Sequence, residues 1–488
     1  MERKDRMRPS QVIRLATQYM VFGVVGALLT IFFLVLFWRK RQQKRPLTTK
    51  EIPWSVFGAA GILVGYLIIV AGATLVSRGR YEQSLAQLKF LETYEEAWYN
   101  ADIAEWRDLI LNIFMFIPIG FLFPFLRNCF KKWWVTYLGG FCLTFMIEST
   151  QFVLRCGVFQ VDDLWNNLLG TMIGYSLFCL LHALKKRFIF RKKISWRLVL
   201  LMQMPILICV LAFLILFVSY QRKEFGNLSC ENIKRHDNVE VIIEPKLVAN
   251  QKENSVLLWK SQVYTRKEAL FRAKSILQMA GFTLDKEDFE FYETQAVFRS
   301  FGRQAAIWIN YQGGTFDYEN YMQQWDSHGN PILLNENATR KKVEDALTQL
   351  NITVPSYASF EKQEDGYYRF ATKDNGTLHA INGFLLCRYT VNDTISSLRY
   401  YMIKTTPYKK WQIHSSQWCI SQLKKGRFYK IESGEQNQNK LEQKKQIRIH
   451  SIKLNFLPDS KGYYRPIFHC IGRCDGKDGW YIDIPAQK

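Results

Sequence analysis

Apolar residues are distributed unevenly along the 488 residues of the chain. Long apolar runs crowd the first 220 residues, whereas the rest of the chain alternates polar, aromatic and β-branched residues. A helix crosses the hydrocarbon of a bilayer with ~20 mainly apolar residues, and short alternating segments favour strands. The pattern therefore predicts a helical membrane bundle followed by a water-soluble domain.

Six of the apolar runs have the length of a transmembrane helix. The third contains Pro118 and Pro124 and has the weakest pattern of the six. The predicted spans cover roughly residues 15–37, 53–76, 109–126, 133–153, 163–184 and 198–219.

The predicted fold class is an all-α polytopic membrane bundle of about six transmembrane helices, followed by an α+β extracytoplasmic domain. In that last domain, helices near 264–282 and 339–352 are each followed by strand-like segments, which favours one or two helix-plus-strands units. The boundaries that we infer are 1–52 for an N-terminal helix and basic loop, 53–190 for the core of the bundle, 191–220 for a sixth helix, and 221–488 for the outer domain.

The placement of Lys and Arg predicts which ends of the spans face the cytoplasm. Basic residues gather in the loops after the first, third and fifth spans, whereas loops 77–108 and 154–162 are acidic or nearly neutral. Because short cytoplasmic loops are enriched in Lys and Arg, we expect the acidic loops and the C-terminal domain to lie outside. The basic N-terminal stretch MERKDRMR conflicts with this orientation and leaves the extreme N-terminus open.

The formal net charge of +22 comes from 65 Lys and Arg against 43 Asp and Glu. Much of the excess lies in the predicted cytoplasmic loops, where it suits an anionic membrane surface. The smaller excess of the outer domain would suit anionic envelope polymers or lipid headgroups. We expect membrane lipids as partners and no nucleic acid, and the sequence leaves the oligomeric state open.

Cysteine usage leaves disulfides open and gives little support to a metal site. The stretch HCIGRC offers His469, Cys470 and Cys474 as ligands, but no second ligand cluster completes a site, so we predict neither a metal nor a cofactor. Disulfide pairing cannot be read from one sequence. The cysteines on the predicted outside, where disulfides form, are Cys156, Cys230, Cys387, Cys419, Cys470 and Cys474.

Polar residues at membrane depth are costly and tend to face the interior of a bundle, so they are the first candidates for function. In the fourth span, Glu148, Gln151 and Arg155 fall within an arc of ~60° when each residue turns the helix by about 100°. The sequence thus predicts a carboxylate, an amide and a guanidinium on one stripe near the outer end of this helix.

The third and fifth spans bring further polar residues to the same side. In the third, Asn112 precedes Pro118 and Gly120, which leave a backbone carbonyl unpaired and relax the helix. The fifth begins with polar residues and continues with glycines, which let another helix pack closely. The residues on or beside that face are Asp162, Asp163, Asn166, Asn167, Gly170 and Gly174.

Two interpretations of these residues differ. In the first, Glu148 and Arg155 form an internal ion pair, Asp162 caps its own helix, and the amides hold the helices together. In the second, the residues line a functional pocket in the outer leaflet. One cap needs one polar residue, whereas four follow in quick order within 162–167, so we favour a pocket.

Three stretches, NIFMFIPIGFLFP, IESTQ and RCGVFQVDDLWNNLLGTMIGY, resemble the VanZ-like membrane family in motif and in order. The resemblance covers about residues 55–190 and implies a link to lowered susceptibility to the glycopeptide teicoplanin. The turn after Arg155 is longer than in the family's pattern, and an extra span stands on each side of the motif. The residues that match the family's recurring positions are Asn112, Pro118, Gly120, Glu148, Gln151, Arg155, Asp163, Asn167 and Gly170.

We favour a binding function for the pocket, with Arg155 on an anionic group and the carboxylates and amides on hydroxyls or amides. The ligand would be a lipid, a lipid-linked cell-wall precursor or a glycopeptide headgroup. One alternative is an enzyme in which Glu148 acts with Asp162 or Asp163 on a lipid-linked phosphate. No His, nucleophile motif or phosphate-binding loop accompanies these carboxylates, so catalytic residues stay unassigned. A second alternative to binding is a sensory module that acts through the outer domain. That domain faintly resembles PepSY-type domains.

Overall fold

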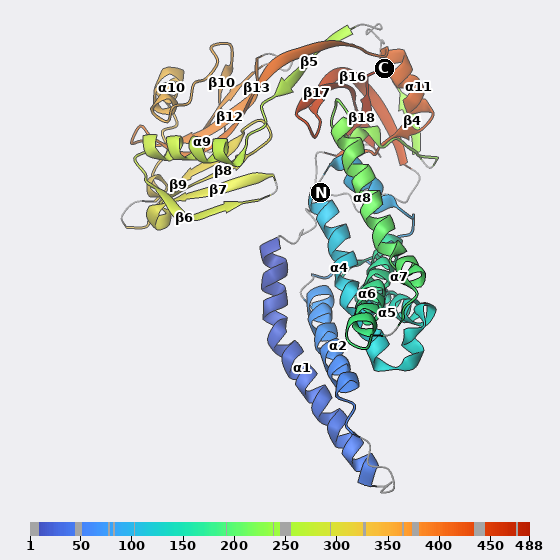
Figure 1. Cartoon of the computed structure of the whole chain (residues 1–488). Coiled ribbons are helices and arrows are strands. Elements are labelled where there is room, and N and C mark those ends of the chain that lie inside the picture. The colour runs from blue at the N-terminus through green and yellow to red at the C-terminus, as the bar shows by residue number, and fades with distance from the viewer. Residues whose placement is uncertain are drawn as a thin grey trace. The chain divides into compact units, whose positions relative to one another are not determined.

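The computed structural model divides the chain into two units, which are described one at a time. Residues 2–98 and 102–223 form the membrane unit, and residues 224–488 form the C-terminal domain (Figure 1). The residues that the structure describes are 9–43, 51–76, 79–81, 83–101, 103–191, 193–237, 239–244, 255–292, 294–325, 328–363, 366–372, 380–433, 445–474 and 477–488.

The membrane unit is helical apart from one pair of short strands. Among the described residues, six helices are long and apolar enough to cross a membrane, which confirms the predicted number of spans. The long helices are α1 (Pro9–Gln43), α2 (Trp54–Ala71, continued by the π-helical turn Gly72–Val76), α4 (Ile103–Leu126), α5 (Trp133–Leu154), α6 (Val161–Phe188) and α8 (Met204–Arg222).

Three details of the unit differ from the predicted spans. Helix α4 runs unbroken through its two prolines and starts earlier, at Ile103. The predicted sixth span, 198–219, is wrong at its start, because α7 (Trp196–Met202) ends before Gln203 and a new helix begins there. The proline near the start of α8 suits a first turn, where its missing N–H costs nothing. Helix α3 (Glu92–Asn100) was not predicted, because it is short and polar.

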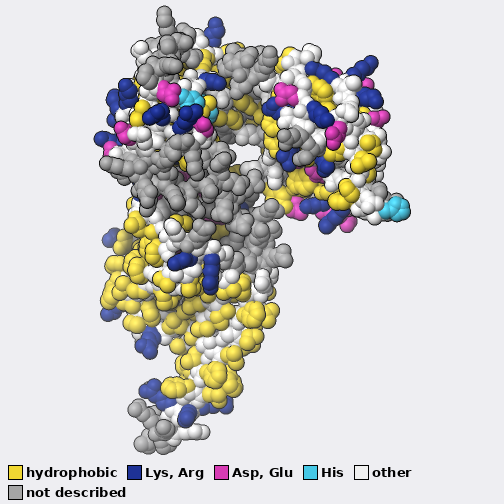
Figure 2. All heavy atoms as spheres, turned by 180° about the vertical axis from the view of Figure 1, so that it is seen from behind, with side chains coloured by type: hydrophobic (Ala, Val, Ile, Leu, Met, Phe, Trp, Pro, Cys, Tyr) yellow, Lys and Arg dark blue, Asp and Glu magenta, His cyan; other side chains and the backbone are white. Residues whose placement is uncertain are grey.

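The surface of the membrane unit is suited to lipid. Helix α8 has no buried residue within the unit, although its composition is strongly apolar. Hydrophobic side chains also predominate over the face of the unit that Figure 2 shows. Apolar surface of this extent is stable against hydrocarbon rather than water, so the unit is that of a multi-pass membrane protein.

Helices α4 and α6 lie in backbone contact. A Cβ atom on Gly120 would lie 2.0 Å from the carbonyl oxygen of Thr171, and one on Gly174 would lie 2.0 Å from that of Ile117. Gly170 makes the same kind of approach, at 2.1 Å from a carbonyl oxygen of α4. Small residues allow such contact between membrane helices, where van der Waals packing replaces the hydrophobic effect as the driving force.

The change Gly174→Ala is therefore expected to force α4 and α6 apart and to destabilise the purified protein by about 1–3 kcal/mol. The measurement is the midpoint of thermal unfolding in detergent. Gly58→Ala in α2 is the matched control, because a Cβ atom there would meet nothing within 4 Å. An unfolding midpoint for Gly174→Ala equal to that of the control would contradict the packing.

The C-terminal domain is built on one branched sheet, which confirms the predicted α+β class. Its main path, among the described strands, follows the order β15-β18-β17-β5-β13-β9-β8-β7-β6. Strand β12 joins at β13 and carries β11 and β10, while β16 joins at β17 and carries β4. The long β13 thus pairs with strands on both sides and connects the two ends of the sheet.

The bounds of the elements are as follows. The helices of the domain are α9 (Arg266–Met279), α10 (Arg340–Gln349) and α11 (Ser416–Lys424). The sheet strands are β4 (Val239–Ile243), β5 (Ser255–Ser261), β6 (Leu284–Phe291), β7 (Gln295–Ser300), β8 (Ala305–Asn310), β9 (Phe316–Asn320), β10 (Ser359–Lys362), β11 (Tyr367–Ala371), β12 (Ile381–Tyr389), β13 (Ile395–Gln412), β15 (Glu432–Ser433), β16 (Lys445–Pro458), β17 (Tyr463–Cys474) and β18 (Lys477–Pro485). A separate pair joins β3 (Lys234–Arg235) to β14 (Arg427–Phe428).

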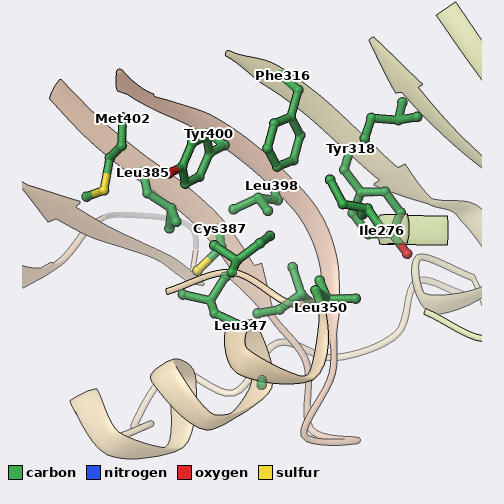
Figure 3. Close-up of a cluster of buried hydrophobic side chains, with 14 of the residues drawn as sticks. Ile276, Phe316, Tyr318, Leu347, Leu350, Leu385, Cys387, Leu398, Tyr400 and Met402 are labelled. Atoms are coloured by element: carbon green, nitrogen blue, oxygen red, sulfur yellow. The ribbon is translucent and has the colours of Figure 1, made fainter. Parts of the chain in front are cut away.

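Helices α9 and α10 share one hydrophobic core. Ile276 from α9 and Leu347 from α10 belong to the same buried cluster as Tyr318, Leu398 and other sheet residues (Figure 3). A reciprocal capping box between Thr265 and Glu268 fixes the start of α9. The two predicted helix-plus-strands segments thus fold around a common core, and α11 covers a second buried cluster at the other end of the sheet.

The first residues of the C-terminal domain are bound firmly to its sheet. The buried carboxylate of Asp459 accepts hydrogen bonds from the backbone N–H groups of Gly226, Lys461 and Tyr463 at 2.7, 2.9 and 3.0 Å. Arg465 donates to Glu231 at 2.5 Å and is itself buried. The first of these bonds, at Gly226, lies four residues after Arg222 in the sequence, where α8 ends.

Replacing Asp459 by Ala is expected to lower the free energy of unfolding by about 2–3 kcal/mol, because it leaves buried N–H groups without an acceptor. Asp478→Ala is the control: its ion pair with Arg473 is largely exposed, and such pairs are worth roughly 0–1 kcal/mol. Thermal unfolding of the full chain in detergent compares the two. Equal losses in both variants would show that Asp459 does not anchor this segment.

Candidate functional site

A pair of short strands joins two loops of the membrane unit. Strand β1 (Leu85–Gln87) pairs in parallel with β2 (Val158–Gln160), directly before α6. The Nε2 atom of Gln160 also donates to the Oε1 atom of Gln87 at 2.6 Å. The loop before α3 is therefore held at the N-terminal end of α6, where the predicted polar residues lie.

Asp162 holds the start of α3 in place. Its two carboxylate oxygens accept hydrogen bonds from the backbone N–H groups of Leu91 and Thr93, at 2.7 and 2.8 Å. The first N–H groups of a helix have no partner within it, and a buried carboxylate there also meets the positive end of the helix dipole. The expectation that Asp162 caps its own helix is wrong, because the N-cap of α6 is Gln160, without a side-chain cap bond.

Asn166 meets α3 one turn further along. The hydroxyl of Tyr94 donates a hydrogen bond to the Oδ1 atom of Asn166, whose side chain is fully buried. Burial, followed by the nearby charges of Asp162 and Asp163, raises the pKa of the Tyr94 hydroxyl. The hydroxyl therefore stays protonated and keeps its role as donor at neutral pH.

Two further contacts join α6 to the neighbouring helices. The Nδ2 atom of Asn112 in α4 donates to Asp163 at 2.5 Å, and the Nδ2 atom of Asn167 donates to the hydroxyl of Thr144 in α5 at 2.8 Å. Polar residues of α4 and α5 therefore both contact the polar face of α6.

The predicted stripe on α5 holds for two of its three residues. Glu148 and Gln151 are both only 3% exposed. Arg155 instead has an exposed side chain, and its backbone adopts a left-handed conformation with φ of 56° as the C-cap of α5. The turn of 100° per residue no longer applies past the end of a helix, so Arg155 leaves the stripe of Glu148 and Gln151.

Residues 57–182 match the family model described as VanZ/LLP1. This segment is VanZ-like. The match runs from α2 into α6 and includes the polar residues of α4, α5 and α6 described above. The predicted resemblance is thus confirmed, with closely similar bounds.

Comparisons of the whole chain add little. No curated protein matches it. A crystal structure of an uncharacterized protein from Eubacterium rectale ATCC 33656 superposes with a TM-score of 0.24 and 9% identity, over 52% of this chain and 90% of that one. The Bacillus megaterium YpeB C-terminal domain superposes with a TM-score of 0.18 and 11% identity, over 46% of this chain and 95% of that one. TM-scores this low support no inference of fold or function.

The VanZ-like segment thus contains a set of inward polar side chains, which we call the polar cluster: Asn112, Thr144, Glu148, Asp163, Asn166 and Asn167. Two of its buried atoms, Nδ2 of Asn166 and Oδ1 of Asn167, have no hydrogen-bond partner in the described structure. Leaving such an atom unpaired costs roughly 1–3 kcal/mol. One N–H donor and one oxygen acceptor are therefore available to a hydroxyl or an amide.

A metal-binding set is not apparent in the parts of the chain that the structure describes: no group of three or more His, Cys, Asp and Glu side chains converges there. In the C-terminal domain, the Nδ1 atom of His469 pairs with Asp483 at 2.7 Å. Cys470 and Cys474 are buried, and they share a face of β17 because side chains alternate along a strand. His469 therefore lies on the opposite face of β17 from both thiols.

Sequence reasoning missed two members of this arrangement. Thr144 lies one helical turn before Glu148 and on the same face, so its position could have been read from the spacing. Tyr94 lies in a short polar helix far away in sequence, and no local pattern points to its contact with Asn166.

Replacing Asp162 by Ala in the VanZ-like segment is expected to free the start of α3. Because two backbone N–H groups lose a charged acceptor, their hydrogen exchange should speed up by about tenfold or more. The measurement is amide hydrogen exchange over residues 91–94 of the full chain in detergent.

The matched control is Lys89→Ala, which removes an exposed ion pair with Glu95 at 2.6 Å in the same segment. Its exchange over residues 91–94 should stay close to that of the wild type. Unchanged protection in Asp162→Ala would show that the carboxylate does not hold α3.

Proposed function

We propose that this chain is a multi-pass cell-envelope protein whose polar cluster binds the polar headgroup of a membrane lipid or of a lipid-linked or glycopeptide compound. The VanZ/LLP1 match supports a role in tolerance to glycopeptide antibiotics of the teicoplanin type. The six apolar helices support a site within reach of lipid headgroups.

The observation that carries the proposal is the pair of buried amide atoms without partners, on Asn166 and Asn167. Buried polar groups in native proteins are normally satisfied. We interpret these two unsatisfied atoms, which lie within a membrane bundle, as the place where a ligand completes the bonding. A hydroxyl or amide group of a headgroup offers the acceptor and the donor that these two atoms require.

The position of Arg155 changes the expected mode of binding. Its exposed side chain follows the end of α5 and lies outside the buried stripe of Glu148 and Gln151. An anionic group of the ligand would therefore meet Arg155 at the rim, while hydroxyl or amide groups occupy the cluster.

The enzymatic alternative receives less support. It requires Glu148 to act with Asp162 or Asp163, but both oxygens of Asp162 accept backbone N–H groups. One oxygen of Asp163 accepts from Asn112 at 2.5 Å. Carboxylate oxygens that already accept structural hydrogen bonds are poorly suited to bind a cation or move a proton. We therefore favour a headgroup-binding function over catalysis.

We also propose that the C-terminal domain lies outside the cytoplasm. Lys and Arg follow α1, connect α4 to α5, and end α6 at Lys185, Lys186 and Arg187. If these basic ends face the cytoplasm, the six spans alternate in direction and the chain leaves α8 on the other side of the membrane.

The headgroup proposal predicts that lipid co-purifying with the full chain, measured by mass spectrometry of detergent extracts, falls in Glu148→Gln and Asn167→Leu. A loss of about 1.4 kcal/mol in binding corresponds to a tenfold weaker affinity, and each change replaces a polar group of the cluster.

Glu95→Gln is the control, because it removes one carboxylate charge from an exposed ion pair. Glu148→Gln should unfold at a temperature near that of the control, so that lost lipid is not lost structure. Asn167→Leu also loses its bond to Thr144 and should unfold at a lower temperature, so its lipid is measured well below that temperature. Lipid retained at the wild-type amount in folded Glu148→Gln and Asn167→Leu would refute the proposal.

A further inference from the structure

Two cysteines of the C-terminal domain lie side by side in its second core. The Sγ atoms of Cys419 in α11 and Cys470 in β17 are 3.6 Å apart, although the residues are 51 positions apart in sequence. Both side chains are fully buried among the residues that α11 packs against the sheet. The described structure thus records a direct contact between these two sulfur atoms.

Cys474 belongs to the same second core, whereas the other two cysteines of the domain lie elsewhere. The Sγ atom of Cys387 lies 3.7 Å from the carbonyl oxygen of Tyr368, within the first core. Cys230 packs against Ile467 in a small separate cluster. The contact between Cys419 and Cys470 is therefore a local feature of α11 on β17.

We propose that Cys419 and Cys470 form a disulfide bond in the mature protein, which rests on the extracytoplasmic placement of this domain proposed above. Disulfides persist in such oxidising compartments. A disulfide bond needs a sulfur–sulfur distance of about 2.05 Å. The sulfur atoms reach it by moving together by roughly 1.5 Å, which side-chain rotation and a small shift of α11 supply.

The oxidant is a disulfide-bearing donor of the thiol–disulfide exchange class. The thiolate of one cysteine attacks a donor sulfur, the donor disulfide breaks, and a mixed disulfide forms. The second cysteine, as thiolate, then attacks the mixed disulfide and releases the donor as a dithiol. Two thiols thus give up two electrons and two protons, and the donor disulfide takes up both.

Burial indicates when this exchange takes place. The contact with Cys419 and burial raise the pKa of the Cys470 thiol well above its ordinary value. Because the thiolate is the reactive form, exchange is slow once α11 covers the pair. The bond therefore forms during folding, and the closed core afterwards shields it from reductants. It ties α11 to β17 across a long stretch of chain, which stabilises the domain through the unfolded state.

The test uses the full chain in membranes from cells quenched with acid. The protein is alkylated with N-ethylmaleimide in denaturant before reduction, and its peptides are mapped by mass spectrometry. We expect a peptide pair linked through Cys419 and Cys470, and a thermal midpoint that falls by about 5 °C or more after reduction in mild denaturant. Cys387→Ala should keep the linked pair and the effect of reduction. Alkylation of Cys419 and Cys470 as free thiols would overturn the proposal.

Two further experiments distinguish a failure of the disulfide proposal from a failure of the proposed extracytoplasmic placement of the domain. Protease added to intact protoplasts reports whether the domain is outside. Free thiols in an accessible domain overturn the disulfide alone, whereas free thiols in a protected domain overturn the placement as well. In Cys419→Ala, the thiol of Cys470 should become alkylatable, and if this variant does not fold, the mapping of the wild type still decides.

Discussion

The arrangement of the polar cluster depends on the backbone contact between α4 and α6, which the glycines of the two helices allow. Gly120 and Gly174 leave so little room that a single methyl group would overlap a carbonyl oxygen of the opposite helix. This contact sets the register in which Asn112 faces Asp163. A larger residue at either glycine would separate the two helices and, with them, the two sides of the polar cluster.

Buried polar contacts then connect the site to its surroundings. Asn167 ties α6 to α5, Asn166 ties it to Tyr94 of α3, and Asp162 holds the start of α3. In a medium of low dielectric constant each satisfied bond is strong and each unsatisfied atom is costly. The cluster combines both: its satisfied bonds hold the helices together, and its two unpaired amide atoms give the proposed headgroup a specific place to bind.

Hydropathy and helical spacing predict much of this arrangement. Span positions follow from apolar length, and the burial of Glu148 and Gln151 follows from the regular turn of α5. The same spacing fails for Arg155, because the helix ends one residue earlier and the chain turns into a left-handed conformation. The roles of Asp162 and Tyr94 depend on contacts about 70 residues away in sequence, which no local pattern encodes.

In the C-terminal domain, too, the sequence predicts local structure but not contacts between distant segments. The apolar face of α9 is visible in the sequence and predicts the helix, whereas the capping box between Thr265 and Glu268 was recognised only in the structure. The pairing of β5 between β13 and β17 is not visible, because those strands follow it by more than 130 residues. Sheet order depends on long-range contacts between apolar surfaces, and those surfaces appear only once the chain has folded.

The central claim is that the polar cluster of α4, α5 and α6 is a headgroup site. A cryo-electron microscopy map of the full chain in nanodiscs, prepared from its native lipids, tests this most directly. The account predicts headgroup density within hydrogen-bonding distance of Asn166 Nδ2 and Asn167 Oδ1. A well-ordered map in which protein side chains alone satisfy both atoms, with lipid density confined to the apolar outer faces of the helices, would contradict it.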